Sequence, residues 1–185
     1  GRSTPTNEWS HIAVTFNGET NYANTYVNGV LEDSHFYSEL SGDIVPSGSD
    51  LIIGESFHGK VDEVRIWNST QSPDALLANM NADMDDSEGL MGYWKFDSSD
   101  VTTAFDSSSR GNDGSITGTP TLGESRFHLD IETPHQGGLF FDGVDDYVGD
   151  INGIDLADKS FSLEVWARKD GSGTLLEQDK LSIGY

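Results

Sequence analysis

The carboxylates that could form a catalytic pair are few and poorly spaced. A glycoside hydrolase needs two carboxyl groups flanking one bond, and the nearest candidates are the adjacent Asp62 and Glu63 and, on another segment, Glu164. Adjacent residues of a strand point to opposite faces, and Glu164 has no acidic residue two positions away. The five histidines are scattered and there is no cysteine, so a Ser-His-Asp set, a zinc spacing and a thiol nucleophile are all missing. We therefore predict that the protein is not an enzyme.

The charge of the chain narrows the range of partners. Its 185 residues include 32 Asp and Glu but only 10 Lys and Arg, which gives a formal net charge of −22. Such a field repels nucleic acid and anionic lipid headgroups and attracts divalent cations. No apolar run is long enough to span a bilayer, so we expect no membrane insertion. The same acidity would also serve simply to keep an exported protein soluble.

Most of the chain is predicted to form short strands separated by turns. Residues 10–16 (SHIAVTF) alternate apolar with polar or small side chains, and residues 161–169 (FSLEVWARK) do the same, with Phe161 inward and Glu164 outward. Asn28-Gly29 between two apolar pairs predicts a tight hairpin. Residues 61–68 carry apolar side chains on both faces, which indicates an inner strand near a sheet edge.

One helix is predicted, within residues 72–84. Ser72 is a suitable N-cap and Pro73 suits the first turn. An apolar stripe follows at helical spacing, formed by Leu76, Leu77 and Met80. We expect this helix to cover part of a sheet.

Together these elements predict an all-β fold, a two-sheet antiparallel β-sandwich of the jelly-roll type with one short helix near 73–84. The length fits one domain, and the 4 Trp, 6 Tyr and 9 Phe can fill the space between two sheets. The aromatic residues expected in the core are Trp94, Phe141, Phe16 and Trp67.

Several motifs resemble the laminin-G-like, or concanavalin A-like, family of jelly-roll domains, but in rotated order. WSHIAVTF, YVNGV and VDEVRIWN resemble the C-terminal half of such a domain, whereas GLMGYWKFD, FFDGVDDYV and FSLEVWARK resemble its N-terminal half. We accordingly divide the chain into residues 1–71 (C-terminal-half strands), 72–88 (short helix and acidic connector) and 89–185 (N-terminal-half strands). These form one domain in total, completed within the chain or with a neighbouring copy.

The resemblance implies a calcium site in many family members, where the FDG turn, an Asn/Asp-rich loop and a late strand come together. Carried over to this sequence, the ligands are Asp142, Asp106, Asn112 and Asp62, with Gly143 offering a carbonyl. Calcium suits such oxygen donors. The alternative is that FDGVDDYV is only a turn, since Asp-Gly forms turns without a metal.

Lectins of this family use loop aromatics to stack on sugars. The candidates here are Tyr22, Phe36, Tyr37, Phe57 and His58, which lie in or near predicted loops. Most aromatics of a sandwich belong to its core, which is the competing interpretation for each of them.

We predict a non-catalytic structural or adhesion repeat unit, extracellular or on a cell surface. Its partners would be copies of itself, in a tandem array or filament in which Tyr185 of one unit meets Gly1 of the next. The alternative is a calcium-dependent carbohydrate-binding (lectin) module. A passive spacer beside a catalytic domain is a third possibility.

Overall fold

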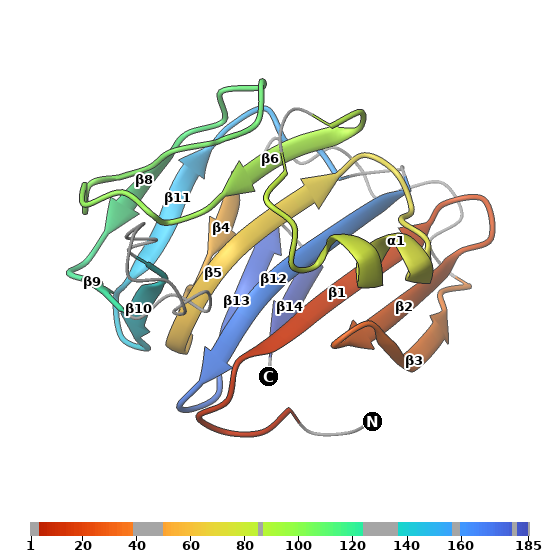
Figure 1. The fold of residues 1–185 in the computed structure, drawn as a ribbon, viewed down its shortest axis with the longest axis horizontal. Helices are drawn as coiled ribbons and strands as arrows, with labels where there is room; N and C mark the ends of the chain where they lie inside the picture. The colour runs from red at the N-terminus through yellow and green to blue at the C-terminus, as the bar shows by residue number, and fades with distance from the viewer. Residues whose placement is uncertain are drawn as a thin grey trace.

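The computed structural model describes residues 4–38, 50–84, 87–123, 137–156, 160–178 and 181–184, which form two antiparallel sheets (Figure 1). Gly1 and Tyr185, the predicted assembly residues, lie outside these ranges. The first sheet has the order β3 (Val30–Phe36), β2 (Tyr22–Val27), β1 (Ser10–Asn17), β12 (Phe161–Lys169), β5 (His58–Trp67), β10 (Leu139–Asp142) and β9 (Thr121–Leu122), with β6 (Leu90–Trp94) also paired to β5. The second has the order β14 (Leu181–Gly184), β13 (Thr174–Gln178), β4 (Leu51–Ile53), β11 (Tyr147–Ile151), β8 (Gly114–Thr117) and β7 (Thr103–Ala104).

Strands from the two ends of the chain alternate in both sheets. β12 lies between β1 and β5, with Ser10 opposite Ala167 and Phe16 opposite Phe161. In the second sheet β4 lies between β13 and β11. The early and late segments therefore complete one sandwich within a single chain, and the structure is the predicted all-β fold.

The main core fills the space between the sheets. Trp94 and Phe141 are fully buried there and Phe16 is 5% exposed, as predicted from the sequence. Trp67 is also buried, but it packs with Leu90 and Tyr93 in a separate cluster. Its strand neighbours Val64 and Ile66 belong to the main core, so β5 is buried on both faces.

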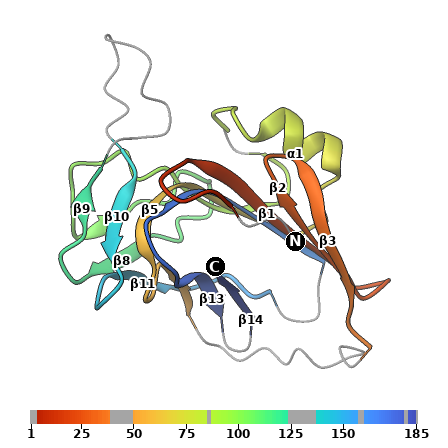
Figure 2. The same ribbon diagram turned by 90° about the horizontal axis from the view of Figure 1, so that it is seen from below.

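The predicted inner position of β5 is therefore confirmed, but the side chains predicted to point outward from β12 are not exposed to solvent. β5 is an interior strand with β12 on one side and β10 and β6 on the other. Ser162, Glu164 and Trp166 are buried. The reason is that helix α1 and the segment after it cover this outer face: the Trp166 indole donates to the carbonyl of Met80 at 2.7 Å. Figure 2 shows α1 lying outside β1 and β2.

Helix α1 (Pro73–Asn79) begins as predicted but is shorter. The Ser72 hydroxyl accepts a hydrogen bond from the amide of Ala75, and the helix ends at the C-cap Met80 rather than at residue 84. Leu76 is buried whereas Leu77 is 52% exposed, so only part of the predicted apolar stripe packs on the sheet. In the part of the chain that is described, no helix has the length and apolar character needed to cross a membrane.

Candidate ligand-binding sites

The predicted calcium ligands do not form one site. Asp106 and Asn112 are brought together, with the Asn112 amide donating to the Asp106 carboxylate at 2.8 Å. That carboxylate also accepts hydrogen bonds from the amides of Tyr93 (2.9 Å) and Ser108 (2.8 Å). These hydrogen bonds shape the loop that precedes β8.

Asp62 lies apart from Asp142, so its inclusion in the ligand set was wrong. Asp142 of β10 pairs with His58 at the start of β5, whereas Asp62 is four residues further along β5, roughly 13 Å at the rise of a strand. Asp62 is 1% exposed and lies opposite Trp166, on the outer face beneath the segment that follows α1. Its strand, rather than a loop, determines where this carboxylate lies.

Asp142 instead forms an acidic cluster with Asp145 and Asp146, in the turn between β10 and β11. We call these three residues the acidic triad. One carboxylate oxygen from each lies within 4.8 Å of the others. Asp146 is 2% exposed and accepts hydrogen bonds from the amides of Thr119 (2.7 Å) and Asp142 (3.0 Å), which fix it in place. Gly143, predicted as a carbonyl ligand, occupies the same turn with φ of +80°.

This acidic triad fits the chemistry of calcium. Three carboxylates at this separation supply hard oxygen donors to an ion that takes six to eight of them. The sequence analysis found Asp142 and missed Asp145 and Asp146. The signal was present, because both follow the Asp-Gly turn within the same motif, FDGVDDYV.

Two of the predicted sugar-binding aromatics meet on the surface of the hairpin formed by β2 and β3. Tyr22 and Phe36 lie opposite each other in register, and their ring centroids are 5.3 Å apart. They are 45% and 50% exposed. Tyr22 pairs with Asn17 and Tyr26 with Ala13, and Tyr26 packs with Leu76 of α1. Alternation along β2 therefore places the Tyr22–Phe36 pair on the outer face, the face that carries α1.

Tyr37 joins a second aromatic contact at the same end of the hairpin. It packs edge-on against His35 with centroids 4.6 Å apart, and its amide donates to the carbonyl of Asn21 at 2.9 Å. His35 neighbours Phe36 along β3, so its side chain points to the opposite face. The predicted aromatic set is thus divided between the two faces of the hairpin.

The remaining two candidates lie elsewhere. Phe57 is fully buried in the main core and cannot stack on a ligand, so that prediction was wrong. Burial follows from its place directly before β5, where the chain enters the sheet. His58 is exposed but lies beside the acidic triad, opposite Asp142, with its ring 5.9 Å from that of Phe140.

The carboxylates considered for catalysis are inaccessible. Asp62, Glu63 and Glu164 are 1%, 6% and 2% exposed. Glu63 accepts hydrogen bonds from Arg65 and Tyr93. A substrate in solution cannot reach these groups without displacing the cover over the first sheet.

The chain folds as a two-sheet β-sandwich domain with an exposed aromatic pair on the β2–β3 hairpin and an acidic triad in the turn between β10 and β11. Residues 1–76 match the Laminin_G_3 family, described as the concanavalin A-like lectin/glucanases superfamily. That match, together with the fold, confirms the resemblance predicted from the sequence. It does not extend to residues 89–185, whose own resemblance stays a prediction. Searches among curated proteins and among solved structures gave no match.

Proposed function

We propose that the protein is a non-catalytic, extracellular carbohydrate-binding domain that serves adhesion. The observation that carries this proposal is the exposed Tyr22–Phe36 pair on the outer face of the hairpin. Two large rings held together by register, on neighbouring strands, offer a fixed apolar surface at low entropic cost. The apolar face of a sugar ring is complementary to such a surface.

Polar groups continue from the aromatic pair along the same face. Asn24 and Ser34 are opposite each other, two residues from Tyr22 and Phe36 respectively, so alternation places all four side chains on one side. An amide and a hydroxyl next to two rings can hydrogen-bond the hydroxyl groups of a sugar. The net charge of −22 favours neutral over anionic glycans.

We also propose that the acidic triad binds a calcium ion that orders the turn between β10 and β11. Three carboxylates repel one another, and a divalent cation would relieve that repulsion. The triad and the Tyr22–Phe36 pair lie on opposite sides of the first sheet's strand order, because four strands separate β10 from β3. Calcium would therefore stabilise the domain rather than contact a sugar on the hairpin.

A glycan array, with and without a chelator, tests the carbohydrate proposal. Saturable binding to one sugar family is expected, and Phe36→Ala should abolish it. Leu77→Ala is the matched control, because Leu77 is a similarly exposed apolar residue (52%) on the same face. The proposal fails if the array shows no binding, or if both variants weaken binding equally.

A structural repeat unit is the second candidate function, suggested by the rotated order of the motifs along the chain. β1 pairs with β12 within the chain, and in a tandem array the same pairing would instead join neighbouring copies. Thr15 lies opposite Ser162, which provides a test. Chains carrying Thr15→Cys are mixed with chains carrying Ser162→Cys: a disulfide between them indicates pairing across copies, and monomers without it argue against this assembly.

A further inference from the structure

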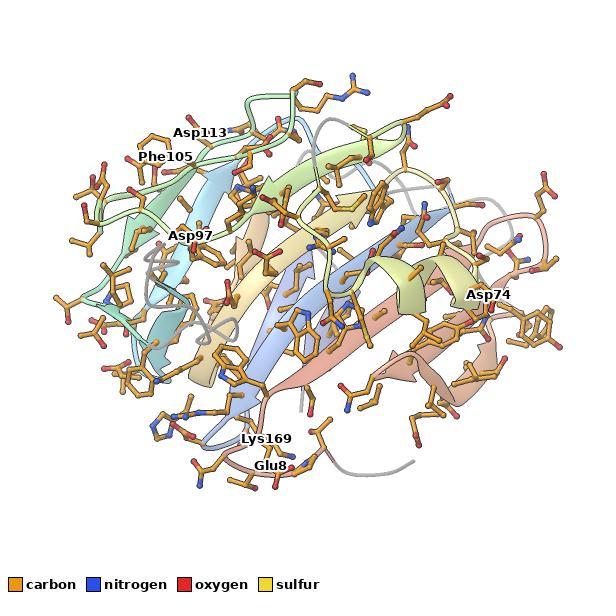
Figure 3. All side chains as sticks on the ribbon, viewed as in Figure 1. Glu8, Asp74, Asp97, Phe105, Asp113 and Lys169 are labelled. Carbon is orange, nitrogen blue, oxygen red and sulfur yellow. The ribbon has the colours of Figure 1, made fainter. Side chains whose placement is uncertain are left out.

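A pocket lies at the other end of the sandwich from α1. It is formed by the segment from Lys95 to Ser107, which joins β6 to the loop before β8, and its volume is about 170 Å³. Figure 3 shows Asp97 and Phe105 of this segment at the side of the molecule opposite Asp74 of α1. The pocket is thus separate from the Tyr22–Phe36 pair, and the volume is below the roughly 300–1,000 Å³ typical of drug-sized ligands. It can enclose one small ring.

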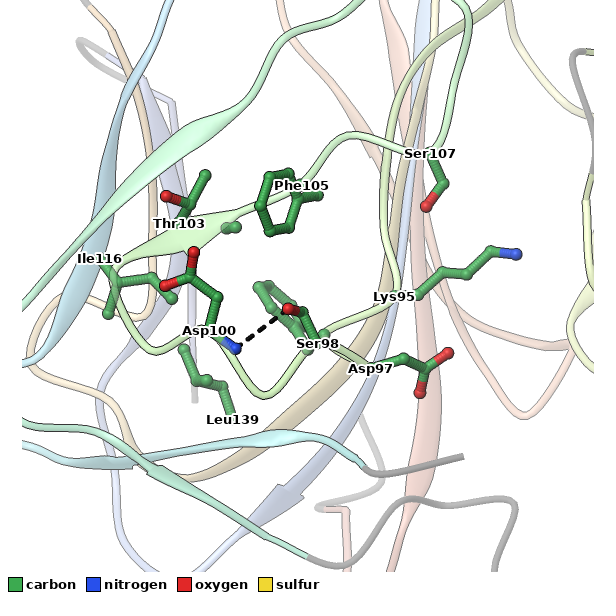
Figure 4. Close-up of a pocket in the computed structure, with 11 residues that line it drawn as sticks. Lys95, Asp97, Ser98, Asp100, Thr103, Phe105, Ser107, Ile116 and Leu139 are labelled. Carbon is green, nitrogen blue, oxygen red and sulfur yellow. Dashed lines mark hydrogen bonds between the residues drawn. The ribbon is translucent and has the colours of Figure 1, made fainter. Parts of the chain in front are cut away.

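The floor and one wall of the pocket are apolar. Phe96, Ala104 and Leu139 line it and are at most 7% exposed. Phe105 also lines it but is 49% exposed, so its ring is available to a ligand. Figure 4 shows Phe105 between Thr103 and Ser107. A solvent-exposed phenylalanine at the mouth of a pocket offers a flat surface for stacking.

The backbone of Phe96 adopts a conformation that costs energy. Its φ is +53°, a left-handed value that is rare for a bulky residue, and such a conformation persists only where its surroundings impose it. The surroundings here include Gly137, which is so close to the Phe96 carbonyl that a side chain at 137 would clash with it. Strain of this kind is concentrated at binding sites.

The polar rim presents hydrogen-bond acceptors. Asp100 is held by the Thr102 amide (2.8 Å) and hydroxyl (2.6 Å), which also keep the pKa of its carboxyl below the usual value. The backbone amide of Asp100 donates to the hydroxyl oxygen of Ser98 at 3.0 Å (Figure 4). The cation of the rim, Lys95, is paired with Asp83 and lies 5.1 Å from the centre of the Tyr93 ring, so its charge is directed away from the pocket.

From these features we infer that the pocket binds a single neutral sugar residue, stacked on Phe105 with its hydroxyl groups donating to Asp100 and Ser107. The inference rests on the proposed carbohydrate-binding function but concerns a different place on the molecule. A stacked ring matches the apolar wall, and hydroxyl groups around its edge match a rim of acceptors. A quaternary ammonium group such as that of choline would also fit an aromatic ring and a carboxylate, so choline is the competing ligand that the experiment must include.

Amide chemical shifts in a titration with single sugars test this site. The probes are the methyl glycosides of glucose, galactose, mannose and N-acetylglucosamine, with choline as the cationic comparison. At least one sugar should shift the amides of residues 95–107. Phe105→Ala should weaken its binding at least about threefold, Phe105→Tyr should restore it, and Leu77→Ala, at an exposed apolar position of α1, should leave it unchanged.

Three outcomes overturn the inference. No shift in residues 95–107 with any sugar means that the pocket is not a sugar site, even if the hairpin amides shift and the proposed function survives. Shifts there with choline alone assign the pocket to a cation. Equal affinity of Phe105→Ala and the wild type removes the stacking argument. Conversely, shifts at the pocket without shifts on the hairpin support this site while refuting the hairpin as the binding surface.

Discussion

The indole N–H of Trp67 donates to the carboxylate of Glu164 at 2.7 Å, linking β5 to β12 on the outer face of the first sheet. The Nε2 atom of His11, on β1, lies 3.2 Å from the other oxygen of Glu164. None of the three residues is more than 3% exposed. One buried carboxylate therefore joins three adjacent strands beneath the cover formed by α1 and the segment after it.

Glu164→Leu should be strongly destabilising, because it leaves the Trp67 and His11 ring nitrogens buried without their partner. We expect a loss of about 3 kcal/mol in the free energy of unfolding, measured by urea denaturation. Glu19→Leu, at an exposed position, is the control and should change stability by less than about 0.5 kcal/mol. Similar losses in the two variants would show that the buried network contributes nothing specific.

Arg65 attaches the end of α1 to the sheet. Its guanidinium donates to the carbonyls of Asn79 (2.9 Å) and Ala82 (2.7 Å) and to the carboxylate of Glu63 (2.6 Å). Arg65→Met should leave Glu63 as a buried unpaired charge and cost about 3–5 kcal/mol. Hydrogen exchange should accelerate most in residues 73–80, and the exposed Arg110→Met variant should not reproduce this pattern. Uniform acceleration along the chain would contradict a role specific to the helix.

The buried hydroxyl of Tyr93 should make the protein less stable at alkaline pH. Burial, followed by the nearby Glu63, raises the pKa of its hydroxyl well above 10, although Arg65 opposes the shift. In the unfolded chain the hydroxyl loses its proton above pH about 10, whereas in the folded chain it keeps it. The unfolded state then binds fewer protons, so this group's contribution is intact below pH 10 and falls as the pH rises further, by at most about 1.4 kcal/mol per pH unit.

The comparison of wild type with Tyr93→Phe isolates this contribution from those of the other tyrosines. Urea midpoints from pH 8 to 11 should fall less steeply for the variant above pH 10. The variant should also be less stable at pH 8, because Glu63 loses a hydrogen bond from Tyr93. Parallel curves for the two proteins above pH 10 would show that Tyr93 ionises normally.

The sequence predicts the strands better than it predicts their surroundings. Alternation locates β1 and β12 and the aromatic core, since period-two patterns depend on local chemistry. It fails at Glu164 and Trp166, which look like outward residues of β12 but are buried under residues distant in sequence. A covered outer face is a tertiary feature, and no local pattern in β12 records it.

In the candidate sites too, local features could be predicted from the sequence, whereas contacts between distant segments could not. Tyr22 and Phe36 are found from the sequence because exposed hairpin aromatics are a local feature, yet their exact partnership depends on register. The predicted calcium ligands came from three segments, and among the described residues an acidic triad is found in the segment around Asp142 alone. The pocket at Phe105 went unpredicted, because Leu139 and Ile116 reach it from other strands.

Calcium should change the stability of the domain through the acidic triad. At a calcium concentration about a hundred times its Kd, binding would add about 2.7 kcal/mol, or about 5–10 °C in Tm for a domain of this size. Asp145→Asn should lose most of this increase, while Glu19→Gln, which removes one charge elsewhere, should keep it. Without calcium the sign reverses for Asp145→Asn: removing one of three mutually repelling carboxylates should raise its Tm slightly above that of the wild type. Differential scanning calorimetry with calcium or a chelator measures both effects, and a wild-type Tm that is the same in both conditions would contradict calcium binding at this turn.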